Sequence, residues 1–272
     1  MGEVQRVMHG LDLGFSSPPE ERHVNDAGHA PYERRFGAVT ITTSGVGWRC
    51  KRQIIFYPRG AYTARMKHAS KQFKSLKIAL KELEPFIRNG KHLETGRPFK
   101  AMHGLLSREG LANWLICAVF NSIAGKEQLT FATVAEEIGG DGVLLDAITG
   151  ESWPTEHVMV PKNDNDERDI ETRVLQAIRD KQQKGGEEYA RGKTLIVFLN
   201  AGNSSEWWPN RVAKALPQPI LFGAIWIVGL HFVENGEYHY NVVEIDVESG
   251  VGHVWRVCIP AGFDQWSVSH IQ

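Results

Sequence analysis

The sequence is poor in cysteine, and its cysteines are not paired at close spacing. Cys50, Cys117 and Cys258 are the only three in 272 residues, and no Cys-x-x-Cys is present. Three widely separated thiols argue against a disulfide framework and against a zinc ribbon. They are typical of a protein from a reducing compartment, so we expect a cytoplasmic protein.

Long hydrophobic runs are also missing. The longest, Pro219 to Val233, is shorter than the ~20 residues that a membrane-spanning helix needs. The first residues lack a basic segment followed by an apolar one, which is the pattern of a secretory signal. We therefore expect no signal peptide and no membrane partner, and we interpret the apolar run as buried strand.

The sequence contains no glycine-rich phosphate loop, since neither G-x-G-x-x-G nor G-x-x-x-x-G-K-[S/T] occurs in it. A doubly wound nucleotide-binding fold is therefore disfavoured. The histidines, among them His231, His239 and His253, are scattered and show no zinc spacing. The formal net charge is -1, so any binding of nucleic acid must depend on a local basic patch.

Such a patch is indicated by the stretch from Trp48 to Lys81, which contains no Asp or Glu. Its ten basic residues are Arg49, Lys51, Arg52, Arg59, Arg65, Lys67, Lys71, Lys74, Lys77 and Lys81. One interpretation is a phosphate-contacting face with aromatic residues between the cations. The other is the solvated face of an amphipathic helix over Tyr62 to Leu83. The candidate nucleic-acid contacts are Arg49, Lys51, Arg52, Arg65, Lys67, Lys71, Lys74 and Lys77.

The second unusual stretch, Gly140 to Lys162, predicts a β-hairpin that contains carboxylates. Two apolar runs flank a turn at Thr149-Gly150, and the acids are Asp141, Asp146 and Glu156. A carboxylate in an apolar strand is costly to desolvate unless something compensates its charge. A divalent metal is one such compensator.

This layout resembles the core of the PD-(D/E)xK, or restriction-endonuclease-like, nuclease superfamily, over roughly Lys100 to Leu230. The resemblance implies that Asp141 or Asp146 and then Glu156 bind Mg²⁺ or Mn²⁺, and that a lysine two residues after the second acid assists catalysis. That position is Val158. Lys162, Lys181 or Lys193 would have to supply the missing group, and Lys162 is included among the expected catalytic residues.

Hairpin register decides which acid faces Glu156, because side chains alternate across a strand. An even-length loop brings Asp141 to the side of Glu156, whereas an odd-length loop brings Asp146 there. We prefer Asp141 and keep Asp146 as the substitute, since Asp146 also suits a structural role near the hairpin turn. Glu109 is a further metal-ligand candidate by the resemblance, but a first-turn acid that favours the helix dipole is the simpler interpretation. His157 faces the wrong side and is expected to be packed.

The order of expected elements predicts a three-layer α/β fold with a mixed sheet. From Arg108 onward it is helix, strand, hairpin, helix, buried strand, helix and buried strand. We expect a flexible arm over residues 1–35, a basic strand and helix extension over 36–99, and the restriction-endonuclease-like core over 100–272. The hairpin should lie beside the strand Thr194 to Leu199.

Three functions remain open. The first is a metal-dependent nuclease acting on nucleic acid, with DNA as the expected substrate and a homodimer as one expected assembly. The second is a catalytically degenerate nuclease-fold protein that binds nucleic acid or serves as an assembly subunit. The third is a protein-interaction module without a nucleic-acid role. Loss of the lysine separates the first two, and the acid-free stretch separates both from the third.

Overall fold

The computed structural model describes residues 75–98, 105–132, 141–162, 165–200 and 206–272. The expected arm over 1–35 lies outside these residues, as does the part of the expected basic extension from 36 to 74. Of the candidate nucleic-acid contacts only Lys77 is described, and it is exposed.

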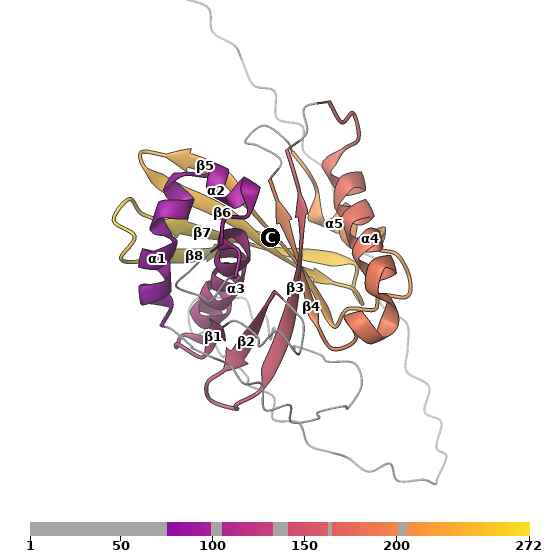
Figure 1. Cartoon of the computed structure of the whole chain (residues 1–272), viewed down its shortest axis with the longest axis horizontal. Coiled ribbons are helices and arrows are strands. Elements are labelled where there is room, and N and C mark those ends of the chain that lie inside the picture. The colour runs from indigo at the N-terminus through magenta and orange to yellow at the C-terminus, as the bar shows by residue number, and fades with distance from the viewer. Residues whose placement is uncertain (1–74, 99–104, 133–140, 163–164, 201–205) are drawn as a thin grey trace, which may run out of the picture. The chain divides into compact units, whose positions relative to one another are not determined.

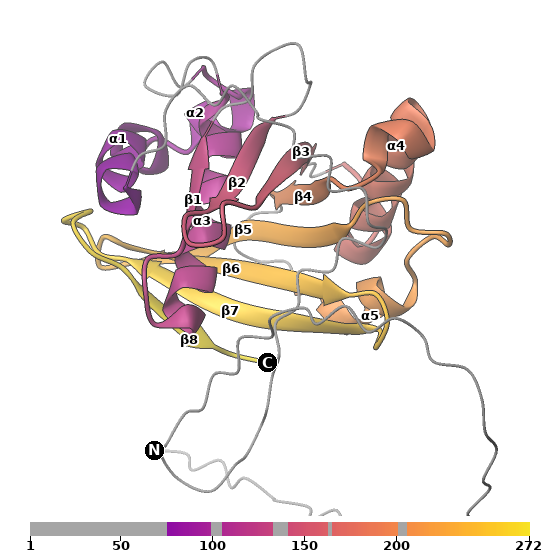
Figure 2. The ribbon, with the colours of Figure 1, turned by 90° about the horizontal axis from the view of Figure 1, so that it is seen from below.

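Eight strands form one mixed sheet in which each strand lies beside its neighbours in the sequence. They are β1 (Leu129–Ala132), β2 (Gly142–Asp146), β3 (Ser152–Val160), β4 (Thr194–Leu199), β5 (Ala224–Glu234), β6 (Glu237–Asp246), β7 (Val251–Ile259) and β8 (Ser267–His270). Strands β3, β4 and β5 are parallel and the other pairs are antiparallel. Figure 2 shows the strands following one another across the sheet. The hairpin lies beside β4, as predicted.

The helices cover both faces of this sheet (Figure 1). They are α1 (Leu76–Arg88), α2 (Lys91–Thr95), α3 (Ser107–Ala124), α4 (Ile170–Ala190) and α5 (Pro209–Lys214). Helices α1, α2 and α3 share one apolar core with one face of the sheet, and α4 and α5 share a second core with the other face. The α/β, three-layer arrangement is therefore confirmed. Among the described helices, none is long and apolar enough to cross a membrane.

Helix α3 is apolar on nearly every side, as the sequence predicts. Trp114, Leu115 and Ile116 are all fully buried, because α1 packs on one side of α3 and the sheet on the other. Its N-cap is Leu106, and the Glu109 carboxylate accepts a hydrogen bond from the Leu106 amide at 2.8 Å. This hydrogen bond closes the first turn of α3.

Helix α1 covers the described part of the helix that the sequence predicts from Tyr62 to Leu83. Ser75 is the N-cap of α1 and accepts a hydrogen bond from the Ile78 amide, so α1 begins at Leu76. The expected helical positions 62–74 lie outside the described residues. Pro85 lies inside the helix, which continues to Arg88. Leu76, Leu80 and Leu83 are buried in the core shared with α3. Helices α1 and α2 precede the expected boundary near residue 99, and both contribute residues to the core of α3.

Candidate active site

The register of the hairpin brings Asp141 next to Glu156. Gly142 pairs with Thr155 and Leu145 with Ser152, so an even number of residues, the six from Asp146 to Glu151, separates the last paired positions. The Asp141 amide donates to the Thr155 carbonyl at 2.8 Å, and the Asp141 carboxylate accepts from the His157 amide at 2.7 Å. The preferred alternative, Asp141 with Glu156, is therefore the one that the register supports.

Asp146 has a structural role at the other end of β2. Its carboxylate accepts hydrogen bonds from the Ile148 and Thr149 amides at 2.8 and 3.0 Å, and from the Gln128 side chain at 2.6 Å. Burial opposes its ionisation, but these hydrogen bonds outweigh burial and lower its pKa. Because the carboxylate is used by the turn, Asp146 does not join the site and the substitute assignment is dropped.

Two lysines from other elements reach the Glu156 carboxylate. Lys181 of α4 has its Nζ 3.1 Å from Glu156 Oε2 and 3.9 Å from Asp141 Oδ2. Lys193, just before β4, donates to Glu156 Oε1 at 2.7 Å. The hydroxyl of Tyr189, on the last turn of α4, also donates to Glu156. One nitrogen, Lys181 Nζ, therefore lies within 4 Å of both carboxylates.

Strand β3 contains no lysine, so the two lysines that contact Glu156 come from other segments of the chain. Val158 shares a face with Glu156 and packs in the apolar core beneath α4. Lys162 is exposed past the far end of β3, about 20 Å along the strand from Glu156 at ~3.3 Å per residue. The expected catalytic role of Lys162 is thus not supported, since its backbone is too far away, and the lysines that contact Glu156 are Lys181 and Lys193.

Burial and the lysines together shift the pKa values of the two acids in opposite directions. Burial raises the pKa of Asp141, and the His157 amide and Lys181 only partly offset that effect. Burial also opposes ionisation of Glu156, but Lys193, Tyr189 and Lys181 outweigh it and hold the Glu156 pKa below its usual value. The pKa of Lys181 is raised, because Tyr189 and the acids outweigh its own desolvation. Lys181 is therefore an ammonium at neutral pH.

Glu109 lies at the edge of this group. Burial raises its pKa to about 7, with Asp141 adding to the rise and Lys181 opposing it. Its carboxylate also accepts the Leu106 hydrogen bond that starts α3. Glu109 is therefore an acid of the first helical turn, as the simpler interpretation has it. Its charge also interacts with that of Asp141.

Three buried polar side chains lie together on the face of the hairpin opposite to Glu156. The side chains of Asn113, Thr155 and His157 have buried polar atoms without a hydrogen-bond partner among the described residues. A Cβ added at Gly142 would lie 2.5 Å from Asn113 Nδ2 and 3.0 Å from Thr155 Oγ1, so glycine is required there. Burial lowers the pKa of His157 to about 3, so its ring is neutral. The expectation that His157 faces away from Glu156 is confirmed.

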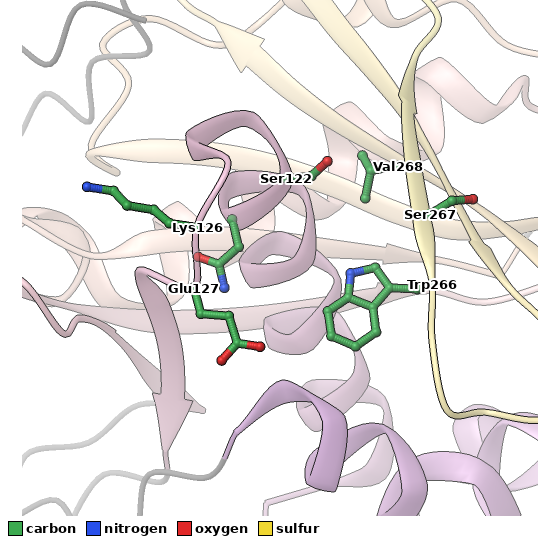
Figure 3. Close-up of a pocket in the computed structure, with 7 residues that line it drawn as sticks. Ser122, Lys126, Glu127, Trp266, Ser267 and Val268 are labelled. Carbon is green, nitrogen blue, oxygen red and sulfur yellow. The ribbon is translucent and has the colours of Figure 1, made fainter.

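A shallow hollow of about 370 Å³ lies elsewhere, between the C-terminal end of α3 and the start of β8 (Figure 3). Its lining residues are Asn121, Ser122, Lys126, Glu127, Trp266, Ser267 and Val268. Glu109 is in the first turn of α3, and an 18-residue helix is about 27 Å long. The hollow is therefore separate from the acid pair.

Sequence reasoning found the two acids and named the lysines as alternatives, but it missed Tyr189, Asn113 and Thr155. Tyr189 follows Gly186, whose φ of 66° breaks the helical geometry of α4. The periodicity of the sequence does not reveal where the chain points after such a kink. Comparisons of the chain with models of protein families, with curated proteins and with solved structures gave no match.

Proposed function

We propose that this protein is a metal-dependent phosphodiester hydrolase acting on nucleic acid, with Asp141 and Glu156 as the metal ligands. The observation that carries the proposal is the position of Lys181 Nζ, 3.1 Å from one carboxylate and 3.9 Å from the other. In this proposal an ammonium from α4 replaces the one that Val158 cannot supply.

The element order supports the same assignment. Helix α3, strand β1, hairpin β2–β3, helix α4 and strand β4 follow one another, and β3 and β4 are parallel. This order resembles the core of PD-(D/E)xK nucleases, where the first acid starts one strand and the second lies in the next. Asp141 directly precedes β2 and Glu156 lies within β3.

The donor atoms fit Mg²⁺ or Mn²⁺. Both ions prefer oxygen ligands, and Mg²⁺ is commonly held by one or two carboxylates with water in the remaining positions. The Asp141 side chain is 32% exposed, so solvent can reach this edge of the pair. When bound, such an ion lowers the pKa of a coordinated water and stabilises charge on a phosphate.

The side chains of this chain supply the remaining functions. The raised pKa of Lys181 keeps it protonated, so it acts as a fixed positive charge beside a phosphate rather than as a base. Lys193 and Tyr189 hold one orientation of the Glu156 carboxylate. They are therefore positioning residues, whereas Lys181 would face the substrate.

A binding-only protein is the second candidate function, and one contact favours it. Lys193 lies 2.7 Å from Glu156, and together with Lys181 it already compensates the carboxylate without any metal. In that case the acids and lysines form a structural ion cluster. The acid-free basic stretch would then carry the whole function.

The test is cleavage of a supercoiled plasmid in Mg²⁺ and in Mn²⁺ by the wild type, Glu156→Gln and Lys181→Met. Removing one charge-stabilising group typically lowers the rate by ~10²–10³, and we expect a loss of that size in both variants. The matched control is Lys184→Met, which removes an exposed lysine from the same helix and should leave cleavage unchanged.

Cleavage that persists undiminished in Glu156→Gln would remove this site from consideration. If neither the wild type nor the variants cleave and DNA binding is retained, the binding-only function is correct. Val158→Lys provides a further check, because a gain of activity in that variant would mean that Lys181 replaces the strand lysine only in part.

A further inference from the structure

A second cluster of ligand-type side chains lies on β6 and β7, away from the acid pair. Glu237 and His239 are two residues apart on β6, so they share a face, and Cys258 is directly opposite His239 on β7. Among the described residues this is the one group of three His, Cys, Asp or Glu side chains whose ligand atoms all lie within 4.8 Å of one another.

The three ligand atoms are spaced for a single small ion. Cys258 Sγ is 3.5 Å from Glu237 Oε2 and 3.9 Å from His239 Nε2, and the last two atoms are 3.8 Å apart. Tetrahedral coordination with bonds of about 2.0–2.3 Å separates sulfur, nitrogen and oxygen ligands by roughly 3.4–3.6 Å. The atoms therefore need to move by only a few tenths of an ångström.

Neighbouring side chains restrict the two strand ligands. The Phe232 ring stacks on His239 with 4.2 Å between centroids and 21° between planes. Cys258 is paired with Ser267 of the neighbouring strand β8. Outer contacts of this kind fix the orientation of metal ligands. The cluster is thus held by four segments, since Phe232 belongs to β5.

We propose that Glu237, His239 and Cys258 bind a borderline transition-metal ion of the Zn²⁺ type, with the fourth position open to water or an external ligand. The donor set decides the metal class. Thiolate, imidazole and carboxylate are the ligands of Zn²⁺, whereas Mg²⁺ and Ca²⁺ take oxygen ligands. Three protein ligands with one open position are the arrangement of reactive rather than purely structural zinc sites.

Binding at this site releases a proton. Burial and Glu237 raise the pKa of the Cys258 thiol, so without metal the sulfur is protonated at neutral pH. The ligand is the thiolate, and metal affinity therefore rises with pH. No sequence motif indicates this site, because Cys258 and His239 are 19 residues apart and meet only through strand pairing.

The experiment is titration of the full chain with Co²⁺, a spectroscopic substitute for Zn²⁺. We expect a sulfur-to-cobalt charge-transfer band in the near ultraviolet, the visible bands of tetrahedral cobalt, and displacement of both by Zn²⁺. Cys258→Ser should abolish the charge-transfer band. His239→Gln should weaken Co²⁺ affinity about 10-fold or more, since even outer-shell partners typically contribute 10–100-fold. Cys50→Ser is the matched control and should keep the band.

A charge-transfer band that survives in Cys258→Ser, or the absence of any such band in the wild type, would overturn the proposal. Circular dichroism of each variant separates loss of a ligand from loss of the fold. The Asp141–Glu156 pair contains no sulfur, so Glu156→Gln should leave the band intact. Conversely, Cys258→Ser should leave plasmid cleavage intact, and the two proposals can therefore fail independently.

Discussion

At the scale of single residues, Glu156 shows how a charge is kept inside a sheet. Its side chain is 4% exposed, yet Lys181, Lys193 and Tyr189 all contact its carboxylate. Two ammonium groups and a hydroxyl compensate the desolvation that burial imposes. Glu109 lacks such compensation, because a lone backbone amide is its one hydrogen-bond donor among the contacts of the described residues.

Glu109 should therefore make the protein less stable as pH rises. Its pKa is about 7 in the fold and 4.5 when exposed, so between these values the unfolded chain binds fewer protons and the free energy of unfolding falls with pH. Glu109→Gln should remove a cost on the order of 3 kcal/mol above pH 7 and change little at pH 4. Urea unfolding at both pH values measures this, with the exposed Glu127→Gln as control. Equal effects at both pH values would contradict it.

The residues of the site were predictable from sequence only up to a choice between alternatives. Parity of the hairpin loop separates Asp141 from Asp146, and the sequence leaves the length of that loop open by a residue. The choice among Lys162, Lys181 and Lys193 needs the distance between α4 and β3 and the rotation of α4 about its axis. These quantities are set by packing of the apolar core under α4, and no local pattern reports them.

At the scale of elements, the junction of α3 and β1 depends on one side chain. Asn121 Oδ1 accepts hydrogen bonds from the Gln128 and Leu129 amides at 2.9 and 2.6 Å, and its Nδ2 donates to the Leu129 carbonyl at 2.8 Å. Gln128 and Leu129 are buried, so water cannot replace these bonds. Asn121 thus fixes where the first strand leaves the helix.

Asn121→Ala should accordingly lower the free energy of unfolding by about 3 kcal/mol. Each buried group left without a partner costs ~1–3 kcal/mol, and this change leaves three backbone groups unpaired. Chemical denaturation measures the loss. The control is Ser122→Ala, at the next and exposed helix position, which should be close to neutral. A loss for Asn121→Ala no larger than the control would mean that the junction rearranges without cost.

Elements with strongly apolar sequences were predicted, whereas the two short elements α2 and β8 were not. The buried runs of β4 and β5 and the apolar α3 are evident because hydrophobic residues dominate them. Helix α2 has five residues. Strand β8 has four, of which three are exposed and one is half-buried. Both elements bury little apolar surface, since only Leu93 of α2 is buried and no residue of β8 is, so neither leaves a hydrophobic pattern in the sequence.

At the scale of the whole molecule, charge is unevenly distributed along the chain. The net charge is -1, yet ten basic residues occur from Trp48 to Lys81 without one acid. Since bulk charge gives no attraction to a polyanion, binding of DNA would depend on this stretch. Lys77 is exposed on α1, and α1 belongs to the same core as α3. The last residues of the basic stretch, including Lys77 and Lys81, therefore belong to a helix that packs in the core.

DNA affinity should fall steeply with salt if this stretch binds phosphates. Charge reversal of Lys71, Lys74 and Lys77 should make the slope of log affinity against log salt less steep by about 1 per lysine. Fluorescence anisotropy at several salt concentrations measures the slope. The control reverses Lys126, Lys184 and Lys214, three exposed lysines elsewhere, and removes the same net charge. Equal effects of both triples would show a general charge effect and contradict the assignment.

The order of the strands has a consequence for how this chain is made. Position in the sheet and position in the sequence coincide from β1 to β8, so each strand emerging from the ribosome finds its partner already in place. The sheet can thus grow one strand at a time from the N-terminal side, with hairpins as the connections after β5. The antiparallel pairings close short loops and form quickly, whereas the parallel pairings of β3 with β4 and of β4 with β5 close longer connections that contain α4 and α5. The strands therefore lie in the sheet in the same order in which the ribosome synthesises them.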